Sequence, residues 1–359
     1  MVRFPSGLVA VCLFFLSLAI QASPAMAQDC YRVFLVGDAG DHTVAEETLV
    51  NLQKELLKYP QSAVVFLGDN SYRDILWGII PHGFKGFDSS GNTIKKVRSQ
   101  MSLLDNYRGS VFFIPGNHDW WNRSTYQKGV SKLVMEESFI EENLKNNSTI
   151  ANPGNVFLPR KGAYGPDFVE LNQGTLRIVF FDSYRIVQTG IKKGKVTDEE
   201  KLFYLKMDSV IHEGWVRKQK ILVVSHHPVY TIGPQNRSLK NPYLFARIKA
   251  SSPDFPSYRE MISQILPILK RYPGIYYASG HLHALQYIRT ADSVHYIISG
   301  AGSKEKSLSE KEIRKFDSSL RPGEYLLWNT GGFFTIDFCG EQANTTLYFD
   351  NGSLQCTLP

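Results

Sequence analysis

Long hydrophobic runs are almost absent from this chain of 359 residues. The longest, LVAVCLFFLSLAI at residues 8–20, has 13 residues, whereas a membrane-spanning helix needs about 20. No later segment suffices, so we expect no membrane span. The run follows Arg3 and precedes QASPAMAQ, where Ala25 and Ala27 form an A-x-A cleavage pattern. Residues 1–27 are therefore predicted to be a secretory signal, and we expect export to an extracellular, periplasmic, or lysosome- or vacuole-like compartment.

A strong excess of either charge is also lacking. The formal net charge of +6 falls to +5 when Arg3 leaves with the signal, and so mild an excess does not favour a nucleic-acid partner. No repeat, low-complexity tract or long linker interrupts residues 28–359, which predicts one large domain. Because 43% of the residues are hydrophobic and 13% aromatic, the chain is not disordered and can bury a large core.

Cysteine is scarce, with four residues in the whole chain. Cys12 follows the bulky Val11 and is no convincing lipid-attachment site, and it leaves with the predicted signal. In an oxidising compartment the remaining cysteines are expected to pair. Because Cys339 and Cys356 both lie near strand-like segments at the C-terminus, we expect them to form a disulfide. Cys30 would then be free, or would compete for one of these partners.

Apolar runs rich in β-formers recur along the chain. They are YRVFLVG, AVVFLG, VFFIPG, LRIVFFD, KILVVSH, GIYYASG and VHYIISG. Amphipathic helical periods lie between several of them, at residues 45–56, 203–211 and 261–269. Strands that alternate with helices indicate an α/β architecture, and continuous apolarity indicates that both sheet faces are covered. With the C-terminal runs EYLLWN, GGFFTIDF and TTLYFD read as antiparallel strands, the sequence predicts a two-sheet α/β sandwich.

Polar side chains with metal-binding or acid–base chemistry directly follow five of these predicted strands. They are Asp38; Asp69, Asn70 and Tyr72; Asn117, His118 and Asp119; His226 and His227; and His281 and His283. One such residue alone would more often be a turn or capping residue. Ligands of open α/β sheets bind beyond the carboxyl ends of the strands, so five groups in that position indicate a site. The other histidines lack this placement, and we expect His42, His82, His212 and His295 to be ordinary surface or core residues.

The donor set favours two hard or borderline cations. It contains Asp, Asn, His and Tyr but no thiolate. Seven ligands are too many for one ion that must keep coordination positions open for water and substrate. They suit two ions about 3.5–4 Å apart that share a carboxylate. Asp69 is the natural bridge. Because a phenolate stabilises a trivalent ion, Tyr72 indicates ferric iron at one of the two positions.

These residues stand in five ordered motifs: D-x-G at 38–40, GDxxY at 68–72, GNHD at 116–119, VxxH at 223–226 and GHxH at 280–283. The set resembles that of the purple acid phosphatases, within the calcineurin-like metallophosphoesterases, over about residues 31–302. The small size resembles the short, tartrate-resistant type. The resemblance implies a four-layer α/β/β/α sandwich of two mixed sheets flanked by helices.

The resemblance also implies roles for the motif residues. Asp38, Asp69, Tyr72 and His283 would hold Fe(III). Asp69, Asn117, His226 and His281 would hold a divalent ion, Fe, Zn or Mn. His118 would face the substrate and assist departure of the leaving group in a secreted acid phosphatase that hydrolyses small phosphate monoesters with metal-activated water.

One position departs from the short-type pattern. A further active-site histidine nine residues after the VxxH ligand is replaced by Gln235 in this chain. His227 and Tyr230 are nearby candidates for a second proton donor, although we expect His227 to fill a position that is often aromatic. Phosphodiester, nucleotide or pyrophosphate hydrolysis on the same metal core is the alternative function, and a non-catalytic binding protein is a third. The oligomeric state stays open, a monomer included.

Overall fold

A computed structural model describes the chain over residues 30–72, 92–120, 126–147, 149–190, 196–232, 256–305, 309–311, 313, 320–350 and 355–358. The predicted signal at residues 1–27, His82 and Gln235 lie outside these ranges. Within them, no helix is both long enough and apolar enough to span a membrane.

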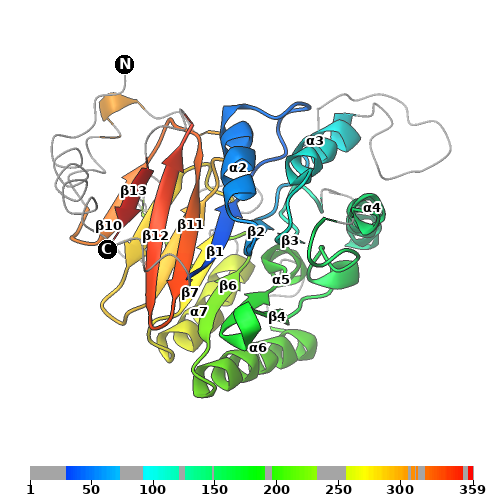
Figure 1. Ribbon diagram of the computed structural model, residues 1–359. Coiled ribbons are helices and arrows are strands. Elements are labelled where there is room, and N and C mark those ends of the chain that lie inside the picture. Colours follow the sequence, from blue (N-terminus) through cyan, green and yellow to red (C-terminus); the bar gives the residue numbers. More distant parts are fainter. Residues whose placement is uncertain are drawn as a thin grey trace, which may run out of the picture.

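The first sheet has six strands in the order β13-β12-β11-β1-β2-β3 (Figure 1). Its strands are β1 (Cys30–Val36), β2 (Ser62–Phe66), β3 (Ser110–Phe113), β11 (Gly332–Cys339), β12 (Gln342–Phe349) and β13 (Gln355–Leu358). Strands β1, β2 and β3 run parallel, whereas β11, β12 and β13 pair antiparallel. The sheet is therefore mixed.

The second sheet has seven strands in the order β10-β8-β9-β7-β6-β5-β4. Its strands are β4 (Asp167–Leu171), β5 (Leu176–Phe180), β6 (Lys220–Val224), β7 (Tyr276–Ser279), β8 (Leu285–Arg289), β9 (His295–Ser299) and β10 (Glu324–Leu327). Strands β5, β6, β7 and β9 are parallel, and the outer strands β4, β8 and β10 are antiparallel to their neighbours.

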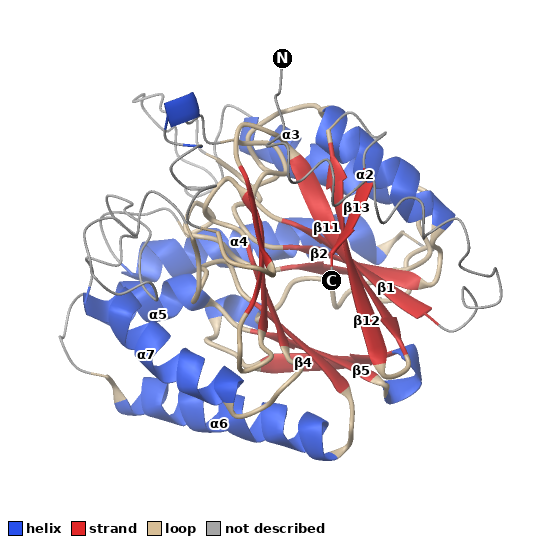
Figure 2. Cartoon of the chain, turned by 90° about the vertical axis from the view of Figure 1, so that its left-hand side faces the viewer, coloured by secondary structure: helices blue, strands red, loops and turns tan. Residues whose placement is uncertain are grey.

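Helices cover the outer face of each sheet. On the first sheet these are α2 (Glu47–Lys58), α3 (Asn92–Met101) and α4 (Tyr126–Lys145), and on the second α5 (Ser183–Gly190), α6 (Asp198–Val216) and α7 (Pro256–Lys270). Figure 2 shows α2 and α3 on the opposite side of the strands from α6 and α7. The four-layer α/β/β/α sandwich is therefore confirmed.

Alternate residues of β1 show why its apolar run is continuous. Val33 and Leu35 lie in the core between the two sheets, while Phe34 and Val36 pack under the helices of the first sheet. Because both faces are buried over residues 33–36, no position there is left for a polar side chain. The predicted helical periods are confirmed in the same way, since Leu49, Leu52 and Leu56 of α2 are buried, as are the predicted positions of α6 and α7.

The disulfide joins Cys30 to Cys339, so the predicted pairing of Cys339 with Cys356 is wrong. The reason is the strand order. Antiparallel pairing of β1 with β11 puts Cys30 directly opposite Cys339, with 4.2 Å between their Cα atoms. Cys356 is instead opposite Leu347 on β12, so that β12 separates its strand from β11.

Candidate metal centre

The candidate site lies where the carboxyl ends of five strands from both sheets meet. Asp38, Asp69 and Asn117 follow β1, β2 and β3 of the first sheet, and His226 and His281 follow β6 and β7 of the second. Backbone hydrogen bonds join these loops within each sheet, from Asp38 N to Gly68 O (3.0 Å) and from Gly280 N to His226 O (3.1 Å). The fold therefore brings together the segments that the sequence singled out.

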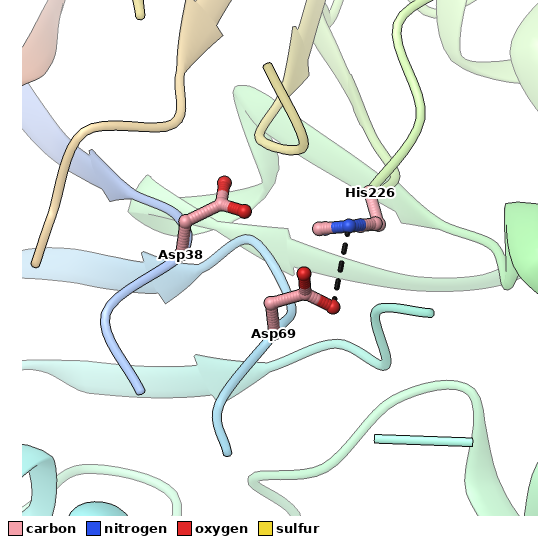
Figure 3. A group of neighbouring side chains, drawn as sticks. All are labelled: Asp38, Asp69 and His226. Carbon is pink, nitrogen blue, oxygen red and sulfur yellow. Dashed lines mark ion pairs between the residues drawn. The ribbon is translucent and has the colours of Figure 1, made fainter. Parts of the chain in front are cut away.

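Asp38, Asp69 and His226 form the centre of the site (Figure 3). Each offers a ligand atom, and these atoms lie within 4.8 Å of one another. All three side chains are buried, and His226 Nε2 lies 3.4 Å from Asp69 Oδ1. Buried carboxylates require positive charge nearby, so this group can hold a metal ion.

Three potential metal-ligand atoms lie around His226 Nε2. Asn117 Oδ1 lies 3.1 Å away and His281 Nδ1 also 3.1 Å away, beside the Asp69 oxygen. The other ring nitrogen of His226, Nδ1, is 2.8 Å from the carbonyl oxygen of Leu67, which fixes the orientation of the ring. Four donors thus converge from four loops around a single point.

A second set of donors gathers at Tyr72. Its hydroxyl donates to Asp38 Oδ1 at 2.7 Å and lies 3.0 Å from His283 Nε2. His283 Nε2 is in turn 3.3 Å from Asp38 Oδ1. The structure therefore brings together all seven side chains that the sequence singled out as metal ligands, in two groups connected by Asp38 and Asp69.

The buried carboxylates act on the pKa values of their neighbours. Burial alone would lower the pKa of His226, but the carboxylates of Asp69 and Asp38 raise it to about 9. Burial, followed by the charges of Asp38 and Asp69, raises the pKa of Tyr72 well above its ordinary value. The carboxylates therefore favour a positive charge beside them, which a bound metal ion would supply. The oxygen and nitrogen donors, with no thiolate, fit hard or borderline ions.

Four of the seven residues have a left-handed backbone, which is uncommon for residues other than glycine. The φ angles are 56° at Asp38, 54° at Asp69, 74° at His281 and 48° at His283. Such conformations cluster at functional sites, where the surrounding structure imposes them. Here the left-handed residues turn the backbone sharply, so that side chains from adjacent loops converge on one point.

Two motif glycines allow the loops to approach closely. A Cβ atom on Gly68, whose φ is +84°, would lie 2.7 Å from Gly116 N and 2.8 Å from His226 Nδ1. A Cβ on Gly116 would lie 2.2 Å from Asp69 N. Any side chain at either position would separate Asp69 from the loop that carries Asn117.

His118 lies at the open side of the site. Its backbone N–H donates to Asp69 Oδ1 at 2.8 Å, while its imidazole Nε2 is 4.0 Å from Asp69 Oδ2. The side chain is 29% exposed, against 2% for Asp69, and its ring centroid is 4.5 Å from that of Tyr72. Burial lowers the pKa of His118, although Asp69 opposes this. The imidazole of His118 is therefore accessible to a substrate, whereas the carboxylate of Asp69 is buried.

Asn70 and Asp119 also follow strands, but they form a buried supporting network. Asp119 accepts hydrogen bonds from Asn70 Nδ2 (3.2 Å), Ser71 N (3.0 Å) and Gly116 N (2.7 Å). Glu136 of α4 accepts from Ser71 Oγ at 3.2 Å. Burial, followed by the charge of Glu136, raises the pKa of Asp119. This network connects the loop of Asp69 to the loop of Asn117.

The sequence did not indicate two buried lysines beside the site. Lys96 of α3 donates to the carbonyl oxygen of Tyr72 at 2.9 Å, and Lys132 of α4 donates to that of His118 at 2.7 Å. Lysine is common on exposed helix faces, so neither residue stands out in the sequence. Only packing of α3 and α4 against the loops reveals them.

The two sequence candidates for a second proton donor are buried. His227 is fully buried, with its Nδ1 2.9 Å from Ser183 Oγ and its ring stacked near that of Tyr184. Tyr230 stacks on Tyr296 in the core between the second sheet and its helices. His227 therefore serves as a packed aromatic residue, as expected, and neither side chain lies on the open side with His118.

This chain is similar to several known proteins. A stretch of 140 residues, 37% of this chain, is 24% identical to tartrate-resistant acid phosphatase type 5 of Sus scrofa and spans only about a third (35%) of that protein. The structure described as GAP50, the anchor in the inner membrane complex of Plasmodium, has a TM-score of 0.57 at 14% identity, covering 92% of this chain and 89% of that one. A dimetal phosphatase from Danio rerio has a TM-score of 0.49 at 14% identity, with 92% and 99% covered.

The family of calcineurin-like phosphoesterases matches residues 31–285, which include all five ordered motifs. The match covers most of the chain and confirms the predicted superfamily. This protein therefore belongs to the calcineurin-like phosphoesterases.

Proposed function

We propose that this chain is an exported acid phosphatase that hydrolyses small phosphate monoesters at a centre of Fe(III) and one divalent ion, Fe, Zn or Mn. The observation that carries the proposal is the place of the Tyr72 hydroxyl, 2.7 Å from Asp38 Oδ1 and 3.0 Å from His283 Nε2. A phenol among a carboxylate and an imidazole supplies the hard anionic donor that suits a trivalent ion.

The two groups of donors divide between the ions. Asp38, Asp69, Tyr72 and His283 would hold Fe(III), and Asp69, Asn117, His226 and His281 the divalent ion. Asp69 belongs to both sets because its Oδ1 lies 3.4 Å from His226 Nε2 and its charge also acts on the hydroxyl of Tyr72. The bound pair supplies Lewis-acid polarisation of the ester and activation of a water molecule.

His118 supplies the acid chemistry. Hydrolysis breaks the ester P–O bond, forms a new P–O bond to the water oxygen, and leaves an alkoxide that needs a proton. The partly exposed imidazole of His118 can donate that proton from the open side of the site. The hydrogen bond from His118 N to Asp69 Oδ1 holds this loop at the bridging carboxylate, so the acid stays next to the reacting group.

Export rests on two observations. The first is the predicted signal at residues 1–27, which lies outside the described ranges. The second is the Cys30–Cys339 disulfide, because disulfides persist in oxidising compartments. The relative from Sus scrofa, an acid phosphatase by its name, agrees with the proposed reaction.

Metal analysis and turnover test the proposal together. We expect iron in the purified protein, a visible absorption band from tyrosinate bound to ferric iron, and faster turnover of a chromogenic phosphate monoester than of the corresponding diester at acidic pH. Iron-free protein that prefers the diester would favour phosphodiester, nucleotide or pyrophosphate hydrolysis on the same fold. Metal-loaded protein with no turnover of either would favour a binding protein.

A further inference from the structure

Lys304 lies at the rim of the candidate metal centre, outside all five motifs. Its Nζ is 4.0 Å from the centroid of the Tyr72 ring, within the range of a cation–π contact. The hydroxyl of the same ring contacts Asp38 and His283. The ammonium group of Lys304 therefore contacts the ring of Tyr72, and the hydroxyl of that ring contacts two other proposed metal ligands.

The side chains around the Tyr72 ring define the open side of the site. His118 packs against this ring at 4.5 Å between centroids, and His283 at 5.9 Å. Their side chains are 29% and 25% exposed, and that of Lys304 is 36% exposed, whereas Tyr72 itself is buried. A substrate that enters beside His118 and His283 therefore meets Lys304 as well.

The loop that carries Lys304 is fastened to the loop of Asp38. Ser303 donates both its N–H (3.2 Å) and its Oγ–H (2.8 Å) to the carbonyl oxygen of Asp38, and its Oγ accepts from Asp41 N at 3.0 Å. Gly302 N donates to Gly37 O at 3.0 Å. Because these bonds fix the backbone on both sides of Ser303, Lys304 keeps its position relative to the first metal-ligand loop.

The charge of Lys304 is available to an anion. Its ion pair with Asp41 is long, at 3.4 Å, and both side chains are about one-third exposed, at 36% and 29%. Exposed pairs of this kind contribute little to stability. A phosphate oxygen can therefore replace the Asp41 carboxylate at small cost.

We propose that Lys304 binds a phosphoryl oxygen of the substrate and thereby favours dianionic phosphate monoesters over monoanionic diesters. This inference rests on the proposed function and deepens it. A lysine ammonium binds phosphate as a point charge, so its attraction grows with the charge on the phosphoryl group. A diester has one negative charge fewer, so its electrostatic attraction to the Lys304 ammonium group is weaker.

The test compares Lys304→Met with the wild-type protein, both loaded with metal. Calorimetric titration with inorganic phosphate should show a Kd about tenfold higher in the variant, the loss expected for one hydrogen bond to a charged group. At pH 6.5, kcat/KM should fall about tenfold for a chromogenic monoester and by less than about threefold for its diester. Lys304→Arg, which keeps the charge, should retain most of both properties.

Two control variants separate this role from a general effect of charge. Lys206 is exposed on α6, which covers the outer face of the second sheet, and Lys206→Met should change neither phosphate binding nor the ratio of monoester to diester turnover. Asp41→Asn removes the competing carboxylate and should leave phosphate binding equal or tighter. Lys304→Gln serves as a second neutral variant if Lys304→Met does not fold.

The outcomes judge the two proposals separately. An unchanged Kd for phosphate in both neutral variants, or equal losses for monoester and diester, would overturn the role of Lys304. Wild-type protein that turns over neither ester would overturn the proposed function, and the phosphate titration would still decide whether Lys304 binds the anion.

Discussion

The hydroxyl of Tyr72 donates to Asp38 Oδ1 at 2.7 Å, across 34 positions of sequence and between the loops after β2 and β1. With His283 Nε2 3.0 Å away, this contact places a phenol among the donors of one proposed metal position. A substitution at Tyr72 is therefore the most direct test for ferric iron.

Replacement of Tyr72 by phenylalanine should remove the visible absorption band of the iron-loaded protein. The ring and its packing stay, while the phenolate donor is lost. Absorption spectra of matched iron contents provide the measurement, and Tyr204→Phe, at a buried tyrosine in the core of the second sheet, is the control. A band that survives in Tyr72→Phe would refute the assignment of Tyr72 as the iron ligand.

His118→Ala should lower kcat by about 10²–10⁴ while the metal content stays the same, because general acid catalysis contributes that much. His118 offers its backbone N–H, not its ring, to Asp69 at hydrogen-bonding distance. Metal analysis and turnover of a chromogenic monoester are measured on the same preparation. His212→Ala, on the exposed surface of α6, should change neither. Metal lost along with activity would instead assign His118 to the ligands.

Asp69→Asn should abolish stabilisation by metal. The φ of 54° at Asp69 suits asparagine better than alanine, so the amide tests the charge without adding backbone strain. Wild-type protein should gain about 3 kcal/mol of unfolding free energy at metal concentrations 100-fold above Kd. Thermal unfolding with and without chelator measures the gain. An equal gain in the variant would show that the ions bind elsewhere.

Loss of the Cys30–Cys339 disulfide should destabilise the protein by about 2–5 kcal/mol. The bond joins residues 309 positions apart and ties the first described strand to β11. Chemical denaturation of Cys339→Ser measures the loss, and Cys356→Ser is the matched control that should leave stability nearly unchanged. Peptide mapping without reductant that finds Cys339 linked to Cys356 would contradict the pairing.

Asp182 should make the protein less stable as pH rises from about 4 to 7. Burial raises its pKa to about 7, although hydrogen bonds from Arg185 N (3.0 Å) and Trp120 Nε1 (2.6 Å) lower it. The unfolded value is about 3.9. Between these values the native state keeps a proton that the unfolded state has lost, so the contribution is complete below pH 4 and gone above pH 7.

Asp182→Asn keeps an oxygen for the Trp120 N–H but cannot titrate. Its unfolding free energy should therefore change less between pH 4.5 and pH 7.5 than that of the wild type, by up to a few kcal/mol. Denaturant titrations at several pH values provide the comparison. The exposed Asp198→Asn should follow the wild-type profile, and a parallel profile for Asp182→Asn would contradict the prediction.

Strands that contain a continuous apolar run could be predicted from the sequence. β1 and β2 were recognisable because residues 33–36 and 63–66 are all apolar and buried. β4 was missed because it is an edge strand whose burial alternates, and β13 because its sequence, QCTL, contains no apolar run. α4 carries many charges along its length and shows only a weak apolar period. In each case the partner of the segment, rather than its own composition, decides its structure.

The residues of the candidate site could likewise be predicted only in part. Placement after a strand was enough to single out a set of polar residues that contains the seven proposed ligands, because the apolar runs reveal where the strands end. It did not distinguish them from Asp119, which also follows a strand and instead accepts hydrogen bonds from Ser71 and Gly116. Nor did it indicate Lys304, whose role depends on the face of Tyr72 that it meets.

The sequence by itself determined the class of fold, the order of the motifs and the donor chemistry, because these depend on local apolarity and on which side chains are present. Only the tertiary structure decided that Cys30 faces Cys339, that the donors form two groups connected by Asp38 and Asp69, and that two lysines brace the loops. Those facts depend on which strands are neighbours and how loops from two sheets meet. Contacts between residues hundreds of positions apart are set by packing of the whole chain, which no local pattern encodes.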